Sequence, residues 1–305
     1  MPAKPELLVV AAIPPELRAR LSPNYTLIED RPGAGETRPG FPVIVTTSMA
    51  GADAPLMAAL PDLKLITCNG TGLDKIDMAA AKARGIVVQH TPDAVTEDTA
   101  DFAIALIYAT SRRLAEADRF VRAGKWKTER MTPSRRVSAR TLGIVGLGKI
   151  GEVIARRASA LGIEVLYTGP REKPDQPYAY HPDIRDLARA VDILVLSCPG
   201  GPATHHTVNA EVLQALGPEG TLINISRGSV VNEADLIEAL EAGIIAGAGL
   251  DVFASEPDID ARFMTMENVV LQPHYASVTG ETRQAMADVI ETAIDTFYTP
   301  KTTSL

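Results

Sequence analysis

The sequence predicts an α/β protein built from two doubly wound domains, each a parallel sheet with helices on both faces. Short apolar runs alternate with helical patterns along nearly the whole chain, and parallel strands need such crossover helices. A glycine-rich turn of the form G-x-G-x-x-G lies at Gly146, Gly148 and Gly151, in the middle of the 305 residues. A complete α/β unit must therefore precede the domain that this turn opens.

The first hundred residues are expected to form that preceding unit. Apolar runs predict strands over 7–11, 43–46, 65–67 and 86–88, and helical spacing predicts helices over 14–21, 53–60 and 78–84. A long helix is predicted over 96–123, where Gly124 ends it. An irregular polar stretch then covers 125–140.

The same alternation resumes after the glycine turn. Strands are predicted over 142–145, 163–167, 193–197, 221–225, 247–250 and 269–271, and helices over 182–190, 210–216, 233–242 and 280–298. We expect residues 101–276 to form one domain, inserted into a second made of 1–100 and 277–305. The last helix then crosses back to the first unit, and a cleft is expected between the two.

The segment 142–151 predicts a dinucleotide-binding turn, because an apolar strand leads into the three glycines and a helical pattern follows. Gly146 allows the tight turn, Gly148 lets the backbone approach a pyrophosphate, and Gly151 lets the helix pack closely on the strand. The diphosphate is expected on the free N–H groups at the start of the helix. The inserted domain is therefore expected to be Rossmann-like.

The residues after the second strand of this domain indicate which nucleotide it prefers. NAD-binding folds usually end that strand with an acid that accepts hydrogen bonds from the ribose, whereas Thr168 and Gly169 stand here. Arg171 and Lys173 follow, and a guanidinium can bind a 2′-phosphate bidentately. We expect NADP(H) to be preferred and NAD to be the alternative, since Glu172 is a competing acid past the strand end.

Composition and charge exclude several classes of protein. A net charge of −8 argues against a nucleic-acid surface, although ten Lys or Arg stand against three acids over 112–140. The apolar run over 7–13 is too short to span a membrane. The two cysteines, Cys68 and Cys198, lie far apart in apolar contexts, which is typical of a reducing cytoplasm and cannot make a metal cluster. We expect a cytoplasmic protein with no metal and no nucleic-acid or membrane partner.

Three polar residues that could do chemistry follow apolar strands of the second domain, namely Arg227, Glu256 and His274. Ligands of open α/β sheets bind beyond the carboxyl ends of the strands. Histidine can carry a proton near neutral pH, a nearby carboxylate favours its protonated form, and arginine offers a planar fork for a carboxylate. Together with a nicotinamide cofactor, this set describes the reduction of a 2-oxo acid.

These residues lie in motifs that resemble the D-isomer-specific 2-hydroxyacid dehydrogenases, and within them the glyoxylate/hydroxypyruvate and hydroxyphenylpyruvate reductase branch. The resemblance covers about 43–298. The motifs that carry it are GLDKID over 72–77, HTPD over 90–93, GLGKIG over 146–151, NISRG over 224–228, GLDVF over 249–253, Glu-Pro at 256–257 and Pro-His at 273–274.

The resemblance implies roles for the residues that match these motifs. Arg227 corresponds to the catalytic arginine, Glu256 to its carboxylate partner and His274 to the acid/base histidine. Substrate contacts are implied for Arg227, His274, backbone N–H groups at Thr71 and Gly72, and a second loop at Ala50 and Gly51. Cofactor contacts are expected from Gly146, Leu147, Gly148, Lys149, Ile150, Gly151, Thr168, Gly169, Pro170, Arg171, Cys198, Pro199, Ile225, Ser226, Arg227, Asp251 and His274.

The implied reaction moves a hydride to the 2-carbon of a small oxo acid, giving a D-2-hydroxy acid. His274 donates a proton to the developing alkoxide, Arg227 holds the carboxylate, and Glu256 keeps His274 charged and oriented. Glyoxylate or hydroxypyruvate is the leading substrate, and 2-ketogluconate or hydroxyphenylpyruvate is the alternative with the same chemistry. An alternative of another class is a nucleotide-sensing, corepressor-like binding protein.

The sequence also departs from the family pattern in two places. The branch often has arginine where Pro170 stands here, so Arg171 replaces it with a shift of one residue. Tyr275 and Ala276 follow His274 where a small aliphatic residue and glycine are usual, which adds bulk near the expected nicotinamide or substrate. The resemblance further implies a homodimer joined through about 101–127.

Overall fold

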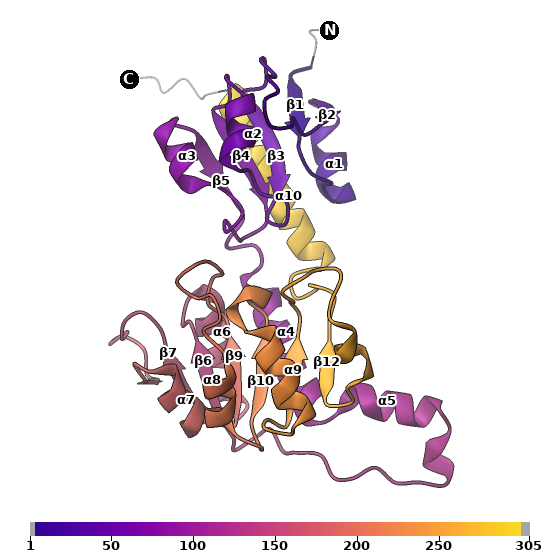
Figure 1. Cartoon of the computed structure of the whole chain (residues 1–305). Coiled ribbons are helices and arrows are strands. Elements are labelled where there is room, and N and C mark those ends of the chain that lie inside the picture. Colours follow the sequence, from indigo (N-terminus) through magenta and orange to yellow (C-terminus); the bar gives the residue numbers. More distant parts are fainter. Residues whose placement is uncertain (1–3, 300–305) are drawn as a thin grey trace. The chain divides into compact units, whose positions relative to one another are not determined.

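The computed structural model describes residues 4–299 and divides into two compact units (Figure 1). Unit 1 consists of residues 1–95 and 278–305, and unit 2 of residues 96–277. Unit 2 is thus an insertion between the two segments of unit 1. From the sequence we expected the boundaries after residues 100 and 276, whereas the structure divides the chain after residues 95 and 277.

Unit 1 contains a five-stranded sheet in the order β2-β1-β3-β4-β5, in which every neighbouring pair is parallel. This is the order of a doubly wound sheet. Its strands are β1 (Glu6–Val9), β2 (Thr26–Glu29), β3 (Val43–Thr47), β4 (Leu65–Asn69) and β5 (Val87–Gln89). Its helices are α1 (Pro15–Leu21), α2 (Ala54–Ala59), α3 (Met78–Ala83) and α10 (Gly280–Tyr298).

Alternate residues of the central strands of unit 1 enter two separate cores, as the period of two of a strand requires. Leu8 and Ile44 pack with the side chains of α2 in one cluster. Leu7 and Val45 pack with those of α1 and with Ile290 of α10 in the other. The last helix therefore covers one face of the first sheet.

Unit 2 contains a seven-stranded sheet in the order β12-β11-β10-β9-β6-β7-β8, again with parallel pairs throughout. This is the Rossmann order with one more strand beyond the sixth. Its strands are β6 (Thr141–Val145), β7 (Glu164–Thr168), β8 (Ala179–Tyr180), β9 (Ile193–Leu196), β10 (Thr221–Asn224), β11 (Gly247–Leu250) and β12 (Val269–Leu271). Its α-helices are α4 (Thr96–Ser111), α5 (Leu114–Arg122), α6 (Lys149–Ala160), α7 (Ile184–Ala190), α8 (Ala210–Leu216) and α9 (Glu233–Glu241).

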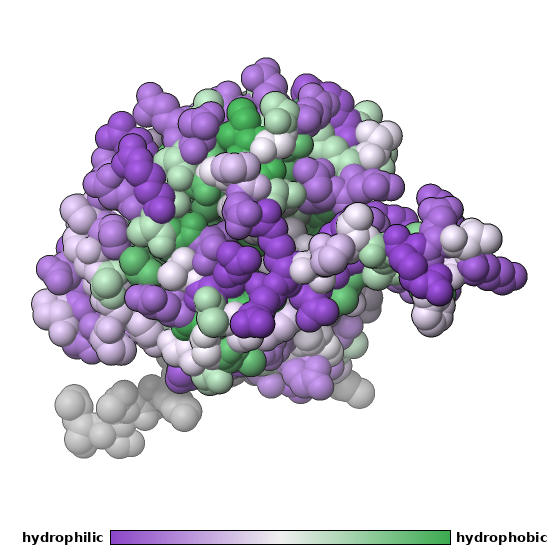
Figure 2. Space-filling view, turned by 90° about the horizontal axis from the view of Figure 1, so that it is seen from below, coloured by the Kyte–Doolittle hydropathy of each residue, from purple (hydrophilic) through white to green (hydrophobic). Residues whose placement is uncertain are grey.

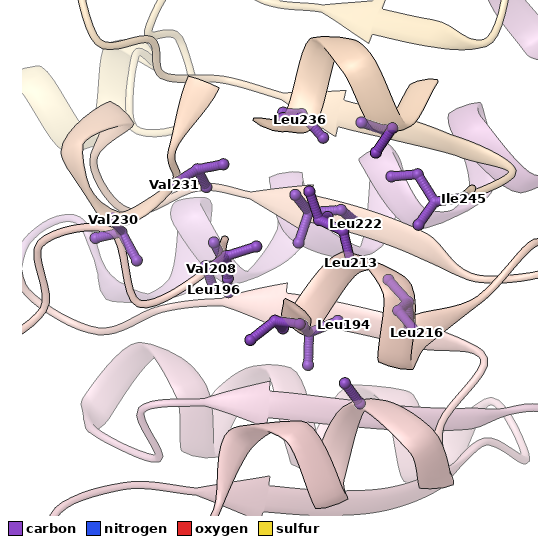
Figure 3. Packing of buried hydrophobic residues seen from close by; sticks show 14 of the residues in the cluster. Leu194, Leu196, Val208, Leu213, Leu216, Leu222, Val230, Val231, Leu236 and Ile245 are labelled. Carbon is purple, nitrogen blue, oxygen red and sulfur yellow. The ribbon is translucent and has the colours of Figure 1, made fainter. Parts of the chain in front are cut away.

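One face of this sheet packs on α7, α8 and α9 through a continuous apolar core (Figure 3). Leu194 and Leu222 of the central strands are completely buried there, and so is Leu213 of α8. The opposite face packs on α4 and α6. These two layers hold the strand ends in fixed positions, and the functional loops begin at those ends.

The predicted fold class is confirmed, but the sequence did not indicate two strands. β2 and β8 lie at sheet edges, and their side chains are only partly covered. An edge strand has a partner on one side only and needs no strong apolar pattern. Among residues 4–299, no helix is long and apolar enough to cross a membrane.

The single helix predicted over 96–123 is wrong, because the chain breaks between α4 and α5. Arg113 has a φ of 51°, in the left-handed region that a right-handed helix cannot continue through. Its guanidinium bonds to Glu116 and to the hydroxyl of Thr132, both outside α4. After the break, α5 buries none of its residues, and a short 3₁₀ helix, Lys125–Lys127, follows it. Residues 114–127 are called the arm below.

Candidate active site

The glycine turn joins β6 to α6, and its three glycines lie in three different environments. Gly146 has a φ of 94°, and a Cβ there would stand 2.8 Å from the backbone of Cys198. A Cβ on Gly151 would stand 2.4 Å from the carbonyl oxygen of Gly146, so this glycine allows the helix to approach the turn. Gly148 is different, because nothing lies within 4 Å of its Cβ position.

Gly148 is also the N-cap of α6, and no side chain caps that helix. The first turn of an α-helix carries N–H groups without an intrahelical partner, and they attract anions. Lys149, Ile150 and Gly151 form this turn, and Leu147 before it is buried. The open side of Gly148 and the uncapped helix start fit a dinucleotide diphosphate.

The end of β7 is neutral and is followed by one exposed cation. Thr168 is buried, Gly169 has open space around its Cβ position, and Pro170 is exposed. Lys173 is held by Glu152 of α6, with 2.7 Å between Nζ and the carboxylate. Arg171 is exposed and has no hydrogen bond or ion pair to other residues of the described range 4–299. Its guanidinium is therefore available to a phosphate.

Arg227 follows β10, and the buried side chain of Asn224 organises the turn that leads to it. The Asn224 amide accepts hydrogen bonds from the N–H and the hydroxyl of Ser226 and donates one to the Arg227 carbonyl. Ile225 and Ser226 are both buried. A Cβ on Gly200 would stand 2.7 Å from Cγ of Arg227, so only glycine leaves room for the arginine side chain. Sequence reasoning missed these roles of Asn224 and Gly200, although Asn224 lies inside the NISRG motif.

Glu256 and His274 are brought together from two different loops. Nδ1 of His274 lies 2.8 Å from Oε2 of Glu256, and Oε1 of the same carboxylate accepts the N–H of Phe253 at 2.8 Å. Burial by itself raises the pKa of Glu256. The hydrogen bonds from His274 and Phe253, with the positive charges of His274 and Arg227, outweigh burial and hold that pKa below its usual range.

Asp251 fixes the backbone around His274. His274 has a φ of 54°, and its N–H donates to the Asp251 carbonyl at 2.9 Å. The two carboxylate oxygens of Asp251 accept the N–H groups of Tyr275 and Ala276 at 2.6 and 3.0 Å. Burial raises the pKa of Asp251, and the two amide bonds oppose it. Asp251 therefore positions the histidine loop, a role that the sequence did not indicate when it suggested a cofactor contact.

Cys198 follows β9 and is buried against the glycine turn, and Pro199 after it is exposed. Burial raises the pKa of the Cys198 thiol to about 11. A thiol with such a pKa stays protonated at neutral pH and is a poor nucleophile. Cys198 can thus form part of a nucleotide wall without chemistry of its own. Among residues 4–299, no three His, Cys, Asp or Glu side chains come together as metal ligands.

The substrate-side residues predicted from the resemblance lie in unit 1, at the carboxyl ends of β3 and β4. The N–H groups of Ala50 and Gly51 both donate to the carbonyl of Thr47. The N–H groups of Thr71 and Gly72 donate to no residue of the described part of the chain. Only the second pair therefore leaves donors open for an anion.

A Rossmann sheet with a nucleotide turn, joined to a hydrogen-bonded His–Glu pair, defines a dinucleotide-dependent oxidoreductase. The family model described as D-isomer specific 2-hydroxyacid dehydrogenase, NAD binding domain, matches residues 104–276. The chain belongs to this family of dehydrogenases.

Individual relatives match nearly the whole chain. Glyoxylate/hydroxypyruvate reductase A HPR2 from Arabidopsis thaliana is 46% identical over 258 residues, which cover 85% of this chain and 82% of the relative. The 2-ketogluconate reductase from Gluconobacter oxydans is 39% identical over 304 residues, covering 99% and 98%. The solved structure of NADPH-dependent glyoxylate/hydroxypyruvate reductase from Sinorhizobium meliloti, in complex with NADP and malonate, has a TM-score of 0.90 and 40% identity, covering 98% and 95%.

The environments of Gly148 and Gly146 predict two different effects of alanine. Gly148→Ala is expected to keep the fold and weaken NADPH binding by about tenfold or more, because its Cβ occupies the open side of the turn where the diphosphate fits. Gly146→Ala is expected to lower the melting temperature as well, since its backbone is left-handed and its Cβ meets Cys198. Fluorescence titration with NADPH and thermal melts measure both. Undiminished NADPH binding by Gly148→Ala would contradict the fit.

Proposed function

We propose that this chain is an NADPH-preferring reductase of small 2-oxo acids, giving D-2-hydroxy acids, with glyoxylate and hydroxypyruvate as its first substrates. The single observation that carries the proposal is the 2.8 Å contact between His274 and a carboxylate of lowered pKa. The names of the similar proteins from Arabidopsis thaliana and Sinorhizobium meliloti support the choice of substrate. The NADPH dependence of the latter supports the choice of cofactor.

The residues of the site divide the work of such a reduction. A bound nicotinamide supplies the hydride. His274, protonated and oriented by Glu256, donates a proton to the oxygen of the former carbonyl, and the lowered pKa of Glu256 keeps the carboxylate charged at neutral pH. Arg227 provides a guanidinium for the substrate carboxylate. Asp251 and Asn224 hold the backbones that carry His274 and Arg227.

A steady-state assay tests the proposal directly. Oxidation of NADPH and NADH is followed at 340 nm, an absorbance specific to the reduced nicotinamide, with glyoxylate, hydroxypyruvate, 2-ketogluconate and hydroxyphenylpyruvate in turn. The highest kcat/KM is expected with NADPH and glyoxylate or hydroxypyruvate. Nucleotide binding without turnover on any of these acids would overturn the proposal.

A second substrate has its own support. The Gluconobacter oxydans relative named 2-ketogluconate reductase matches the chain over 99% of its length. Tyr275, next to the histidine, is 49% exposed and packs against Phe102 in a T-shaped contact with 6.3 Å between ring centroids. The exposed part of Tyr275 is available to a longer polyhydroxy acid, so 2-ketogluconate is the second candidate in the same assay.

The cofactor preference depends on Arg171. Arg171→Ala is expected to raise KM for NADPH about tenfold or more and KM for NADH less than twofold, because a charge-assisted bond to the 2′-phosphate is lost. Lys173→Ala is the matched control, since Glu152 already holds that ammonium group. If Arg171→Ala changed KM for NADPH and for NADH equally, the proposed contact between Arg171 and the 2′-phosphate would be wrong.

The pairing of Glu256 with His274 predicts a change in pH dependence. In Glu256→Gln, the alkaline limb of kcat/KM for reduction is expected to move to lower pH, because the proton-donating imidazolium loses its carboxylate partner. The acidic limb is expected to move less. Glu233→Gln is the control, since Glu233 accepts the N–H of Ala254 in the same region. An unmoved alkaline limb in Glu256→Gln would refute the pairing.

The proposal includes a cytoplasmic homodimer joined through the arm. Both cysteines are free and buried, which suits a reducing compartment. Leu114 and Val121 are each 53% exposed and Trp126 is 62% exposed. Figure 2 shows the arm projecting outward, with more hydrophobic residues among hydrophilic ones. Apolar side chains left uncovered on a projecting helix favour contact with a second copy.

The proposed interface predicts that acidic substitutions on the apolar side of the arm prevent formation of the dimer. Wild-type protein is expected to have twice the chain mass of 32.5 kDa by light scattering, and Leu114→Glu with Val121→Glu is expected to give the monomer. Arg119→Glu, off the stripe formed by Leu114 and Val121, is expected to remain dimeric. A monomeric wild type, or a double variant that stays dimeric, would contradict the interface.

A further inference from the structure

We propose that His90 is a positioning residue for substrate recognition, which orients the backbone N–H of Gly72, beside that of Thr71, toward the carboxylate of the oxo acid. His90 follows β5 in unit 1 and belongs to the HTPD segment, which the proposed chemistry does not otherwise use. The inference rests on the proposed function for the identity of the anion. The orientation of the two N–H groups is argued from the geometry of unit 1.

The segment after β5 holds two consecutive carbonyl groups of the loop after β4. The N–H of Thr91 donates to the Gly70 carbonyl at 3.1 Å. Nδ1 of His90 lies 3.0 Å from the Thr71 carbonyl. Since a carbonyl oxygen can only accept, Nδ1 carries the proton in this contact.

Each of these carbonyls belongs to the same peptide unit as one of the open N–H groups. A trans peptide is planar, and its C=O and N–H point in opposite directions. The bond to the Gly70 carbonyl therefore directs the N–H of Thr71 away from β5, and the bond from His90 does the same for the N–H of Gly72. Both N–H groups lack a partner within residues 4–299, as described above.

Two successive N–H groups that point to the same side form a concave site for an anion. The first of the two peptides is further secured by Thr91, which is 1% exposed. Its hydroxyl accepts the N–H of Gly70 at 3.2 Å, and its carbonyl accepts the hydroxyl of Thr71 at 3.3 Å. Among residues 4–299, only His90 holds the carbonyl of the second peptide, which lies between Thr71 and Gly72.

Because Thr91 secures the first peptide and His90 the second, the contribution of His90 is confined to the peptide between Thr71 and Gly72. Loss of its ring frees the peptide between Thr71 and Gly72 to rotate, while Thr91 continues to hold the loop. The fold of unit 1 is then retained and one of the two aligned donors is lost. Recognition of the carboxylate weakens, whereas the nucleotide turn belongs to unit 2 and is unaffected.

The experiment compares His90→Ala with His90→Asn in the full chain with saturating NADP⁺ or NADPH. An asparagine side-chain amide can place its nitrogen near the position of Nδ1 and so restore the donor. His90→Ala is expected to raise the calorimetric Kd for oxalate, a small carboxylate that is not reduced, and KM for glyoxylate by about five- to tenfold. KM for NADPH and the melting temperature are expected to stay unchanged, and His90→Asn is expected to return both oxalate and glyoxylate values toward the wild type.

Gln89→Ala is the matched control, because within the described range 4–299 the side chain of Gln89 bonds only to the carbonyl of His90, in the same segment. A Kd for oxalate that is unchanged in His90→Ala, equal losses in His90→Ala and His90→Asn, or no oxalate binding by the wild type overturns the inference. If the His90→Ala variant unfolds, His90→Gln replaces it. The side-chain nitrogen of glutamine lies one bond farther from the backbone than Nδ1 of histidine, which is too far to bond the Thr71 carbonyl in the same way. A wild type that binds oxalate but reduces no oxo acid refutes the proposed function, and the oxalate series still tests His90.

Discussion

Parallel pairing of every strand is the constraint on which the positions of all the functional residues depend. In a parallel sheet, all strands end at one edge, and each connection starts there. The loops after β6, β7, β9, β10, β11 and β12 therefore share one edge of unit 2, and those after β3, β4 and β5 share one edge of unit 1. Residues as distant in sequence as Gly146 and His274 lie along the same edge for this reason.

The loops that carry His274 and Arg227 are held by Asp251 and Asn224, whose side chains are buried and hydrogen-bonded. Asp251 is 1% exposed, and an unsatisfied carboxylate at that depth would cost several kcal/mol, roughly. Its two bonds to the backbone remove that cost and keep His274 in a left-handed conformation, which by itself costs about 1–2 kcal/mol. The carboxylate of Asp251 thus holds His274 in a strained backbone conformation. Such strained residues cluster at functional sites, where the surrounding structure stabilises them.

The fold was predictable from the sequence because its signals are local. Buried strands such as 193–196 are continuous apolar runs, and the glycine turn has one glycine at each position where a Cβ would collide or block an approach. The break at Arg113 was not predictable, since its left-handed backbone depends on bonds to Thr132, which lies beyond the arm. The edge strands β2 and β8 lack a full apolar pattern for the physical reason that one side faces solvent.

The site was predictable to a different degree. Arg227, Glu256 and His274 could be singled out because each follows a strand, and the structure brings Glu256 and His274 into contact. Contacts made by backbone groups could not be predicted from the residue types, and only the resemblance implied the N–H groups of Thr71 and Gly72. The residue types do not indicate which amides are bonded. The N–H groups of Ala50 and Gly51 donate to Thr47, whereas those of Thr71 and Gly72 have no acceptor among residues 4–299.

The groups that recognise the carboxylate and carbonyl differ from those that can recognise the remainder of the acid, and this difference bears on substrate specificity. Every 2-oxo acid has the same carboxylate and carbonyl, and the groups suited to them are an arginine, an imidazole and backbone amides. The remainder of the acid must be distinguished by other side chains. Tyr275 after β12 of unit 2 and Met49 after β3 of unit 1 are both exposed, and either can differ without disturbing the first set. Such an arrangement explains how relatives of comparable identity are named for glyoxylate, 2-ketogluconate and hydroxyphenylpyruvate. Under the proposed function, chemistry and substrate choice depend on different residues, so changing the acid requires no change in the proton donor.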